Sequence, residues 1–241
     1  RFKNQPNLKQ HGFDGIRVIY ASEFWPSKKA EKFPNIAHIT TLAENKLGPD
    51  EFVCIDIEHW PLDIRRHRTT AVKRSIAKHA STIATIRAIQ PEKKIGIYSM
   101  FPLRDYHTPT KNKNVHKWEQ ANTFLNPIAQ YSDVIYPSLY TFYDDPDNWK
   151  KYAVANINEA KKYGKTVIAF VWPQYHGSNK AKKYKFIDYK FWLLQLQVVY
   201  QHADGIVIWS PGGTHQSAWN PEAEWWQATK DFIQKNNLIQ K

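Results

Sequence analysis

The sequence is poor in cysteine, with Cys54 the only one among its 241 residues. A single cysteine excludes a disulfide within the chain and any metal site built from several cysteines. Because Cys54 is flanked by Val53 and Ile55, we interpret it as a small buried hydrophobic residue rather than a catalytic thiol. The ten histidines are scattered and form no metal triad, so we expect no metal.

Long apolar runs are also missing from the sequence. No stretch approaches the roughly 18 consecutive apolar residues that a membrane-spanning helix requires. No charged segment followed by an apolar one stands at the start, but the first residue is Arg rather than Met, which leaves export open. We therefore expect no membrane partner and a secreted or periplasmic location.

Acidic residues are outnumbered, since 22 Asp and Glu face 34 Lys and Arg, for a net charge of +12. Such a charge favours polyanionic partners: nucleic acid, anionic lipid or acidic polysaccharide. Aromatic residues make up 15% of the chain, and flat rings with polar edges stack on sugars or nucleobases. No familiar nucleic-acid motif is present and the basic residues are dispersed, so polysaccharide is the favoured partner and nucleic acid is not expected.

Short strand-like runs alternate with amphipathic segments, as in a parallel sheet covered by helices. We expect strands near residues 16–20, 52–57, 94–99, 133–140, 166–172 and 205–209, with a weaker one near 35–39. We expect helices over 65–90, 115–129, 147–163, 189–200 and 221–234. No repeat, low-complexity tract or interdomain linker interrupts the pattern, which predicts one domain over residues 1–241.

The count of six or seven strand–helix units suits a closed barrel better than a doubly wound sheet. No Gly-x-Gly-x-x-Gly turn follows the first strand, which disfavours a nucleotide-binding fold. We therefore expect an α/β fold of the TIM-like (β/α) barrel type, without a cofactor.

Two carboxylates, Asp56 and Glu58, stand where a buried-type strand ends. Side chains two apart on a strand project to the same face, with Cα atoms about 6 to 7 Å apart. A carboxylate pair at the carboxyl end of a barrel strand suits acid–base chemistry, although a salt-bridged pair at the barrel end is the alternative.

The other expected strand ends are rich in aromatic side chains. Each ring alone is more simply explained as packing, but together with two carboxylates they indicate a sugar site, where rings hold the sugar and an acid attacks the glycosidic oxygen. The residues collected at these ends include Trp60, Tyr98, Arg104, Asp105, Tyr136, Tyr140, Trp172, Tyr175, His176, Trp209 and His215.

Four motifs resemble, in order, those of the hyaluronidase family of glycoside hydrolases. Val53–Trp60 looks like that family's Asp-x-Glu-x-Trp signature, and Gly96–Pro102 is similar to its Gly-Tyr-Tyr-x-Tyr-Pro strand. Ile135–Tyr140 resembles its Tyr-Pro-Ser-x-Tyr, and Gly205–Trp209 its Gly-x-x-Ile-Trp. The resemblance spans about residues 15 to 212, in a chain that is shorter than the family's animal members and lacks their disulfides.

The resemblance implies a distorted barrel of about seven strands that cleaves hyaluronan-type polymers with retention, using the substrate's acetamido oxygen as nucleophile. Glu58 would donate a proton to the leaving oxygen and then act as base, while Asp56 would orient the acetamido group. Tyr140 would hydrogen-bond at the same centre and Trp209 would form an aromatic wall. The remaining expected substrate-binding residues are Tyr98, Trp60, Trp172, Tyr136, Tyr175 and Arg104.

Two details refine this assignment, the first from the residues and the second from the resemblance. A carboxylate near Asp56 is harder to ionise, so we expect Glu58 to stay protonated near neutral pH while Asp56 stays charged. Trp172 stands where the family has a second catalytic-site tyrosine, and Tyr175 is the candidate to supply the missing hydrogen bond.

Three lysine clusters on expected loops fit a polymer with repeated carboxylates or sulfates, or else an ordinary basic surface. They are Lys28, Lys29 and Lys32; Lys111, Lys113 and Lys117; and Lys180, Lys182, Lys183 and Lys185. The function expected is a monomeric hydrolase of an anionic, N-acetylhexosamine-containing polysaccharide. The alternatives are a hydrolase or lyase of another acidic or sulfated glycan, and a noncatalytic polysaccharide-binding barrel.

Overall fold

A computed structural model describes residues 2–25, 33–211 and 215–238 of the chain. The first lysine cluster, Lys28, Lys29 and Lys32, lies outside these residues. The chain divides into two compact units. The N-terminal unit comprises residues 15–137 and 158–167, and the C-terminal unit comprises residues 1–14, 138–157 and 168–241.

The N-terminal unit is built on parallel strands in the order of the sequence: β1 (Arg17–Tyr20), β2 (Phe52–Asp56), β3 (Lys94–Tyr98), β4 (Val134–Tyr136) and the start of β5 (Thr166–Val171). The central residues of β2 and β3 are fully buried. Such continuous apolar runs are typical of parallel strands that are covered on both faces.

A close approach between β3 and β4 depends on Gly96. A Cβ atom at this position would lie 2.1 Å from the carbonyl oxygen of Val134 and 2.8 Å from the ring of Tyr136. Only glycine avoids this overlap, and the ring of Tyr136 occupies the space that a side chain would fill.

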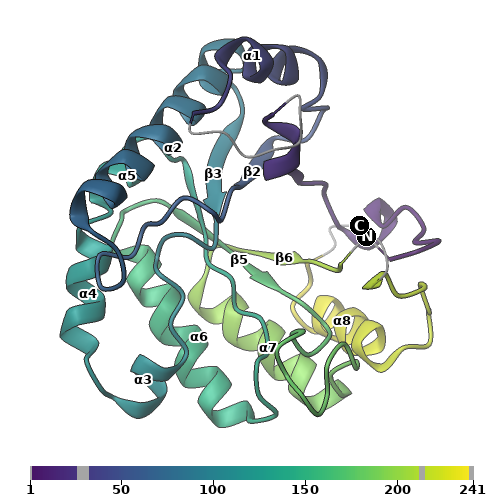
Figure 1. The fold of residues 1–241 in the computed structure, drawn as a ribbon. Coiled ribbons are helices and arrows are strands. Elements are labelled where there is room, and N and C mark those ends of the chain that lie inside the picture. Colours follow the sequence, from purple (N-terminus) through teal and green to yellow (C-terminus); the bar gives the residue numbers. More distant parts are fainter. Residues whose placement is uncertain (1, 26–32, 212–214, 239–241) are drawn as a thin grey trace. The chain divides into compact units, whose positions relative to one another are not determined.

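The helices of this unit follow its strands. They are α1 (Ile36–Asn45), α2 (Thr69–Ile89), α3 (His107–Lys111), α4 (Val115–Thr123) and α5 (Asn126–Ala129), with the short 3₁₀ helix η2 at Ala21–Glu23. Helix α2 confirms the long helix predicted there, and Figure 1 shows α1 beside it.

The weak strand predicted near residues 35–39 is wrong, because that segment begins α1. Asn35 caps the helix by accepting a hydrogen bond from the His38 N–H at 3.0 Å. Ile39, Leu42 and Ala43 then place their side chains on one buried face, at helical spacing.

The C-terminal unit contains the rest of β5 and β6 (Gly205–Ile208), which pair in parallel from Ile168 with Gly205 to Val171 with Ile208. Its helices are α6 (Pro146–Lys161), α7 (Tyr189–His202) and α8 (Glu224–Lys235), with the 3₁₀ helix η1 at Lys9–His11. Helices α7 and α8 lie side by side (Figure 1). A hydrogen bond of 2.9 Å from the Trp192 indole N–H to the Thr229 hydroxyl joins them.

The alternation of parallel strands and helices confirms the predicted α/β, TIM-like fold. The described residues contain six strands, against the seven or so that the sequence motifs imply. Among these residues, no helix combines the length and apolar character needed to cross a membrane. The boundaries between the two units cut through α6 and β5, and the single domain stays a prediction.

Candidate active site

The two carboxylates of the candidate site follow directly from the end of β2. Asp56 is the last residue of the strand and is half-buried, whereas Glu58 is exposed in the turn that follows. Burial, and to a lesser extent the negative charge of Glu58, raise the pKa of Asp56 to about 6. The sequence predicts that Asp56 stays charged near neutral pH, but the strand end shields its carboxylate from water and raises its pKa.

Asp56 heads a row of side chains that crosses the ends of three strands. Ile55 pairs with Ile97, and Tyr98 pairs with Tyr136, so Asp56, Tyr98 and Tyr136 occupy equivalent positions on β2, β3 and β4. Residues at equivalent positions of neighbouring parallel strands share a face of the sheet. Tyr98 is almost fully buried and Tyr136 is completely buried, so both rings belong to the packed interior of this unit.

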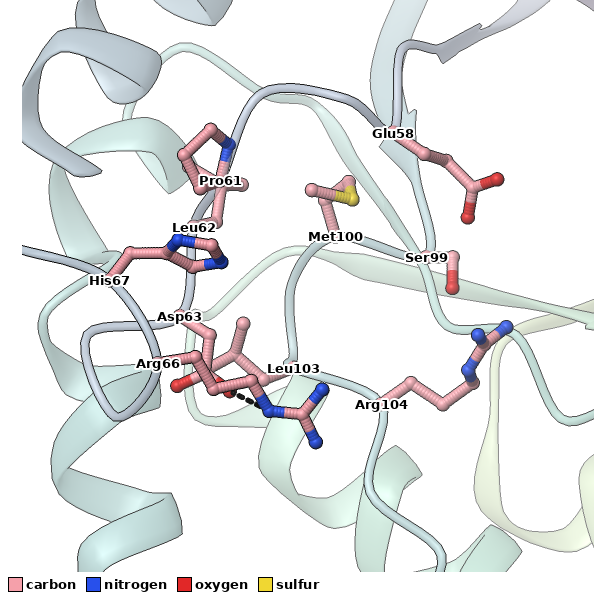
Figure 2. A pocket seen from close by; sticks show the side chains of 10 residues that line it. All are labelled: Glu58, Pro61, Leu62, Asp63, Arg66, His67, Ser99, Met100, Leu103 and Arg104. Atoms are coloured by element: carbon pink, nitrogen blue, oxygen red, sulfur yellow. Dashed lines mark ion pairs between the residues drawn. The ribbon is translucent and has the colours of Figure 1, made fainter. Parts of the chain in front are cut away.

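A pocket of about 220 Å³ opens beside Glu58 (Figure 2). Its walls come from the segment after β2, residues 58–67, and the segment after β3, residues 99–104. Figure 2 shows Glu58, Ser99 and Arg104 on one side of this pocket, and Pro61, Asp63, Arg66 and His67 on the other. The pocket therefore combines one candidate acid with a hydroxyl and cationic groups.

Arg65 ties the two walls together. Its guanidinium donates to both carboxylate oxygens of Asp63 at 2.9 Å, and to Asp105 Oδ2 at 2.9 Å. Burial alone would raise the pKa of both aspartates. Hydrogen bonds and the charge of Arg65 hold the pKa of Asp63 below the ordinary range, and at Asp105 the hydrogen bond from the Thr108 N–H, followed by Arg65, does the same. We call Arg65, Asp63 and Asp105 the clamp; it joins Arg65 to Asp105, 40 positions further along the sequence.

The second wall is also anchored to α4. The Leu103 N–H donates to Asn122 Oδ1 at 2.7 Å, and the Leu103 carbonyl accepts from the Trp118 indole at 2.7 Å. Both backbone groups are buried and both are satisfied, so this part of the wall is rigid.

Trp60, predicted to bind substrate, packs against other aromatic rings of the N-terminal unit. Its ring meets Trp25 edge-to-face at 5.9 Å and His79 at 4.8 Å, and Lys78 Nζ lies 5.1 Å from its centre. Neither ring nitrogen of the fully buried His79 has a hydrogen-bond partner among the described residues. Burial lowers the pKa of His79 to about 3, with minor contributions from His59 and Lys78, so the ring is neutral.

The C-terminal unit brings together three of the predicted aromatic residues. Tyr140 stacks on Trp209 at 5.4 Å, and Trp172 meets Tyr140 at 5.4 Å and Trp209 at 5.1 Å, in both cases edge-to-face. Tyr140 and Trp172 are buried, whereas Trp209 is half-buried. We call these three rings the aromatic cluster.

Trp172 and Tyr175, which bear on the predicted hydrogen bond at the reaction centre, use their polar atoms within this unit. The Trp172 indole N–H donates to Gln174 Oε1 at 2.9 Å. The Tyr175 hydroxyl donates to Asp144, and burial, followed by this bond, raises its pKa. Tyr175 is buried, so its hydroxyl is committed to Asp144 in this structure.

Sequence reasoning missed Ser99, the residues of the opposite pocket wall, and the clamp. Asp105 is expected from sequence at the end of β3, and its Oδ1 accepts from the Thr108 N–H at 2.9 Å. No local signal links Asp105 to Arg65. Within the described part of the chain, no group of three or more His, Cys, Asp or Glu side chains could hold a metal ion.

Known proteins resemble this chain in structure and not in overall sequence. No protein-family model matches it, and no curated protein sequence does. Its structure is similar to that of bee venom hyaluronidase, with a TM-score of 0.63 and 15% identity over 92% of this chain and 84% of that one. The same values hold for bee venom hyaluronidase in complex with a hyaluronic acid tetramer. The chain thus shares the fold of this hyaluronidase, as the four sequence motifs predict.

Proposed function

We propose that the protein is a glycoside hydrolase that cleaves an anionic, N-acetylhexosamine-containing polysaccharide of the hyaluronan or chondroitin type. The observation that carries the proposal is the pair at the end of β2: a half-buried Asp56 with its pKa raised to about 6, next to an exposed Glu58 that lines a pocket. The fold shared with a protein solved in complex with a hyaluronic acid tetramer supports the same substrate class.

In the proposed reaction Glu58 is the acid. It gives its proton to the glycosidic oxygen as the bond to the anomeric carbon breaks, while the substrate's acetamido oxygen bonds to that carbon from the other side. Water then attacks the anomeric carbon, its proton returns to Glu58, and the acetamido group is regenerated. Configuration is retained because the carbon is attacked twice.

The role proposed for Asp56 follows from its raised pKa. In the free protein below about pH 6, Asp56 holds a proton and is neutral. An acetamido N–H that donates a hydrogen bond to Asp56 favours its charged form, which leaves the proton for Glu58. The charged Asp56 then stabilises the positive charge that develops on the acetamido group.

Other residues have binding roles in this proposal. Arg104, on the same side of the pocket as Glu58, would pair with a uronic acid carboxylate (Figure 2). In the C-terminal unit, the half-buried ring of Trp209 would stack on a sugar, with Tyr140 and Trp172 packed against it. Tyr136, Trp60 and Tyr175 are buried and would support the site only by packing. Secretion and a monomeric state stay predictions.

A hydrolase or lyase acting on another acidic or sulfated glycan is the second candidate. It is favoured by Trp172, which replaces a tyrosine of the resembled family, and by lysines exposed on the loop after β5. Such a protein would recognise charge without depending on an acetamido group.

The decisive experiment measures new reducing ends released from hyaluronan, chondroitin, chitin and a sulfated glycan without N-acetyl groups. Glu58→Gln should abolish turnover and retain binding. Glu51→Gln is the matched control, because Glu51 is an exposed acid just before the other end of β2. Unchanged activity in Glu58→Gln would exclude the acid role, and efficient cleavage of the glycan without acetamido groups would exclude the substrate-assisted mechanism.

A further inference from the structure

The loop after β5, residues 177–187, concentrates positive charge in the C-terminal unit. This segment, here called the lysine loop, contains four lysines and no acidic residue. Lys182 is paired with Asp144 and lies 5.1 Å from the centre of the Tyr175 ring. Lys180, Lys183 and Lys185 are exposed, and none has a carboxylate within ion-pair distance among the described residues. Exposed cations without a carboxylate partner are available to a bound anion.

The lysine loop has a defined conformation. Asn179 Oδ1 accepts from the backbone N–H of Ala181 at 3.1 Å and of Lys182 at 2.8 Å. Asn179 Nδ2 donates to the Phe142 carbonyl at 2.9 Å, which ties the loop to the segment after β4. A loop that is held by its own hydrogen bonds presents its charges with little further loss of entropy when a ligand binds.

Tyr184 anchors the far side of the loop. Its φ of 60° lies in the left-handed region, which an aromatic residue adopts only when its surroundings enforce it. The ring lies 5.9 Å from Trp172 and 4.4 Å from His215, and the Tyr184 carbonyl accepts from Gln174 at 2.7 Å. A Cβ on Gly177 would lie 2.6 Å from the Tyr184 hydroxyl, so glycine leaves room for the ring.

The contact with Trp172 joins the lysine loop to the aromatic cluster. Lys183 Nζ lies 5.1 Å from the centre of the Tyr184 ring, so this cation is held at the ring that meets Trp172. A chain of sugars stacked on Trp209 would thus be linked through Trp172 and Tyr184 to Lys183, all within one unit. The path from ring to cation is continuous through side chains in contact.

Phe186 adds an exposed apolar surface to the loop. Its side chain is 42% exposed, although it stacks on Phe2 at 6.2 Å and on Trp225 at 6.4 Å. A pairing between Gln174 and Phe186 fixes the backbone there. An exposed ring on a fixed backbone, next to lysines, suits a sugar face whose acidic group is neutralised alongside.

We propose that the lysine loop is an accessory binding site for acidic polysaccharide, outside the pocket at Glu58. Lys180, Lys183 and Lys185 neutralise carboxylates or sulfates of the polymer, and Phe186 offers a ring to a sugar face. The inference rests on the proposed function for the choice of a polysaccharide as ligand. The chemical class is a sugar polymer with repeated negative charge, so an uncharged N-acetylhexosamine polymer such as chitin gains nothing from the loop.

The test uses the full chain with the triple variant K180Q/K183Q/K185Q. Affinity for long hyaluronan is measured in the Glu58→Gln background, which prevents cleavage, and KM is measured in the active protein. Three exposed charge contacts correspond to an affinity loss of about tenfold at low salt. The loss should shrink near 1 M salt, where the Debye length is about 3 Å. Affinity for chitin oligosaccharides should not change.

The matched control is K150Q/K151Q/K190Q, which removes the same charge from exposed positions of the same unit, on α6 and α7. An equal loss in this control would overturn the proposal, because net charge would then explain the binding. Replacing the three loop lysines by arginine should retain affinity, and a tenfold loss there would likewise contradict it. Single-stranded DNA is the competing probe: a loss of DNA binding with unchanged hyaluronan binding would make the loop a nucleic-acid site instead.

The two proposals fail in different ways. If the loop variant weakens hyaluronan binding but the wild-type protein releases no reducing ends, the accessory site stands and the hydrolase function falls. If the wild-type protein cleaves hyaluronan and the loop variant has unchanged KM and affinity, the hydrolase function stands and the accessory site falls.

Discussion

The raised pKa of Asp56 predicts that the candidate catalytic pair destabilises the fold at neutral pH. The pKa rises from 3.8 to about 6 on folding, so the folded state binds the proton more tightly than the unfolded state does. The stability that this group contributes is present below pH 3.8 and is lost as the pH rises through 6. Replacing Asp56 by Asn removes the titration and keeps the size of the side chain.

A shift of about two pKa units corresponds to about 3 kcal/mol. Because Asp56 is only half-buried and solvent screens its charge, we expect about 1 to 2 kcal/mol. Asp56→Asn should therefore raise the free energy of unfolding at pH 7 by this amount and change it little at pH 4. Asp56→Asn should also lose turnover, so this variant is expected to be more stable at pH 7 but inactive.

Urea unfolding followed by tryptophan fluorescence at several pH values from 4 to 7 provides the measurement. His79 is present in both proteins, so its own pH dependence cancels in the difference. Glu51→Gln, which removes an exposed acid, should show no comparable gain. If the difference between Asp56→Asn and wild type is constant from pH 4 to pH 7, the raised pKa of Asp56 is refuted.

Two further predictions concern the surroundings of the pocket. His79 has a folded pKa lowered to about 3, below its usual 6.5, so the stability that its neutral form contributes should be lost as the pH falls below 6.5. This loss is about 2 kcal/mol at pH 5; urea unfolding should show it in the wild type and not in His79→Leu, and equal pH profiles of the two proteins would contradict it. Arg65→Gln should lower kcat/KM on hyaluronan about tenfold, because both pocket walls lose the side chain that holds them. It should also lower the free energy of unfolding by about 1 to 3 kcal/mol, because Asp63 and Asp105 lose their partner. Arg65→Lys should recover part of the activity, and an Arg65→Gln protein with wild-type kcat/KM would show that the clamp does not position the walls.

The sequence predicts the strands and long helices well where one periodic pattern dominates. Helix α2 is an example, with its regular apolar spacing ahead of Pro91. The pattern fails in short segments. Residues 35–39 are too few for their pattern to distinguish a strand from a helix, and the Asn35 cap and the apolar residues further on decide for a helix. The predicted strand over 133–140 ends at Tyr136, because Pro137 has no N–H to give to a ladder.

Sequence alone finds the two acids of the candidate site and Arg104 in the wall of its pocket. Spacing and position select Asp56 and Glu58, but the raised pKa of Asp56 depends on burial, and burial depends on where β2 ends. The aromatic residues show the same limit. A tyrosine at a strand end, such as Tyr136, reads the same in sequence whether its ring faces solvent or the core.

Because of Gly96, two of the four sequence motifs are not independent of each other. It belongs to the Gly96–Pro102 motif, while Tyr136, whose ring fills the space beside it, belongs to the Ile135–Tyr140 motif. The glycine of one motif is the steric condition for the tyrosine of the other. Two motifs nearly 40 residues apart are therefore one packing unit, and they should be lost or kept together in any related chain. Their joint occurrence is therefore evidence that β3 pairs with β4. It is not evidence for catalysis, which the two acids Asp56 and Glu58 suggest instead.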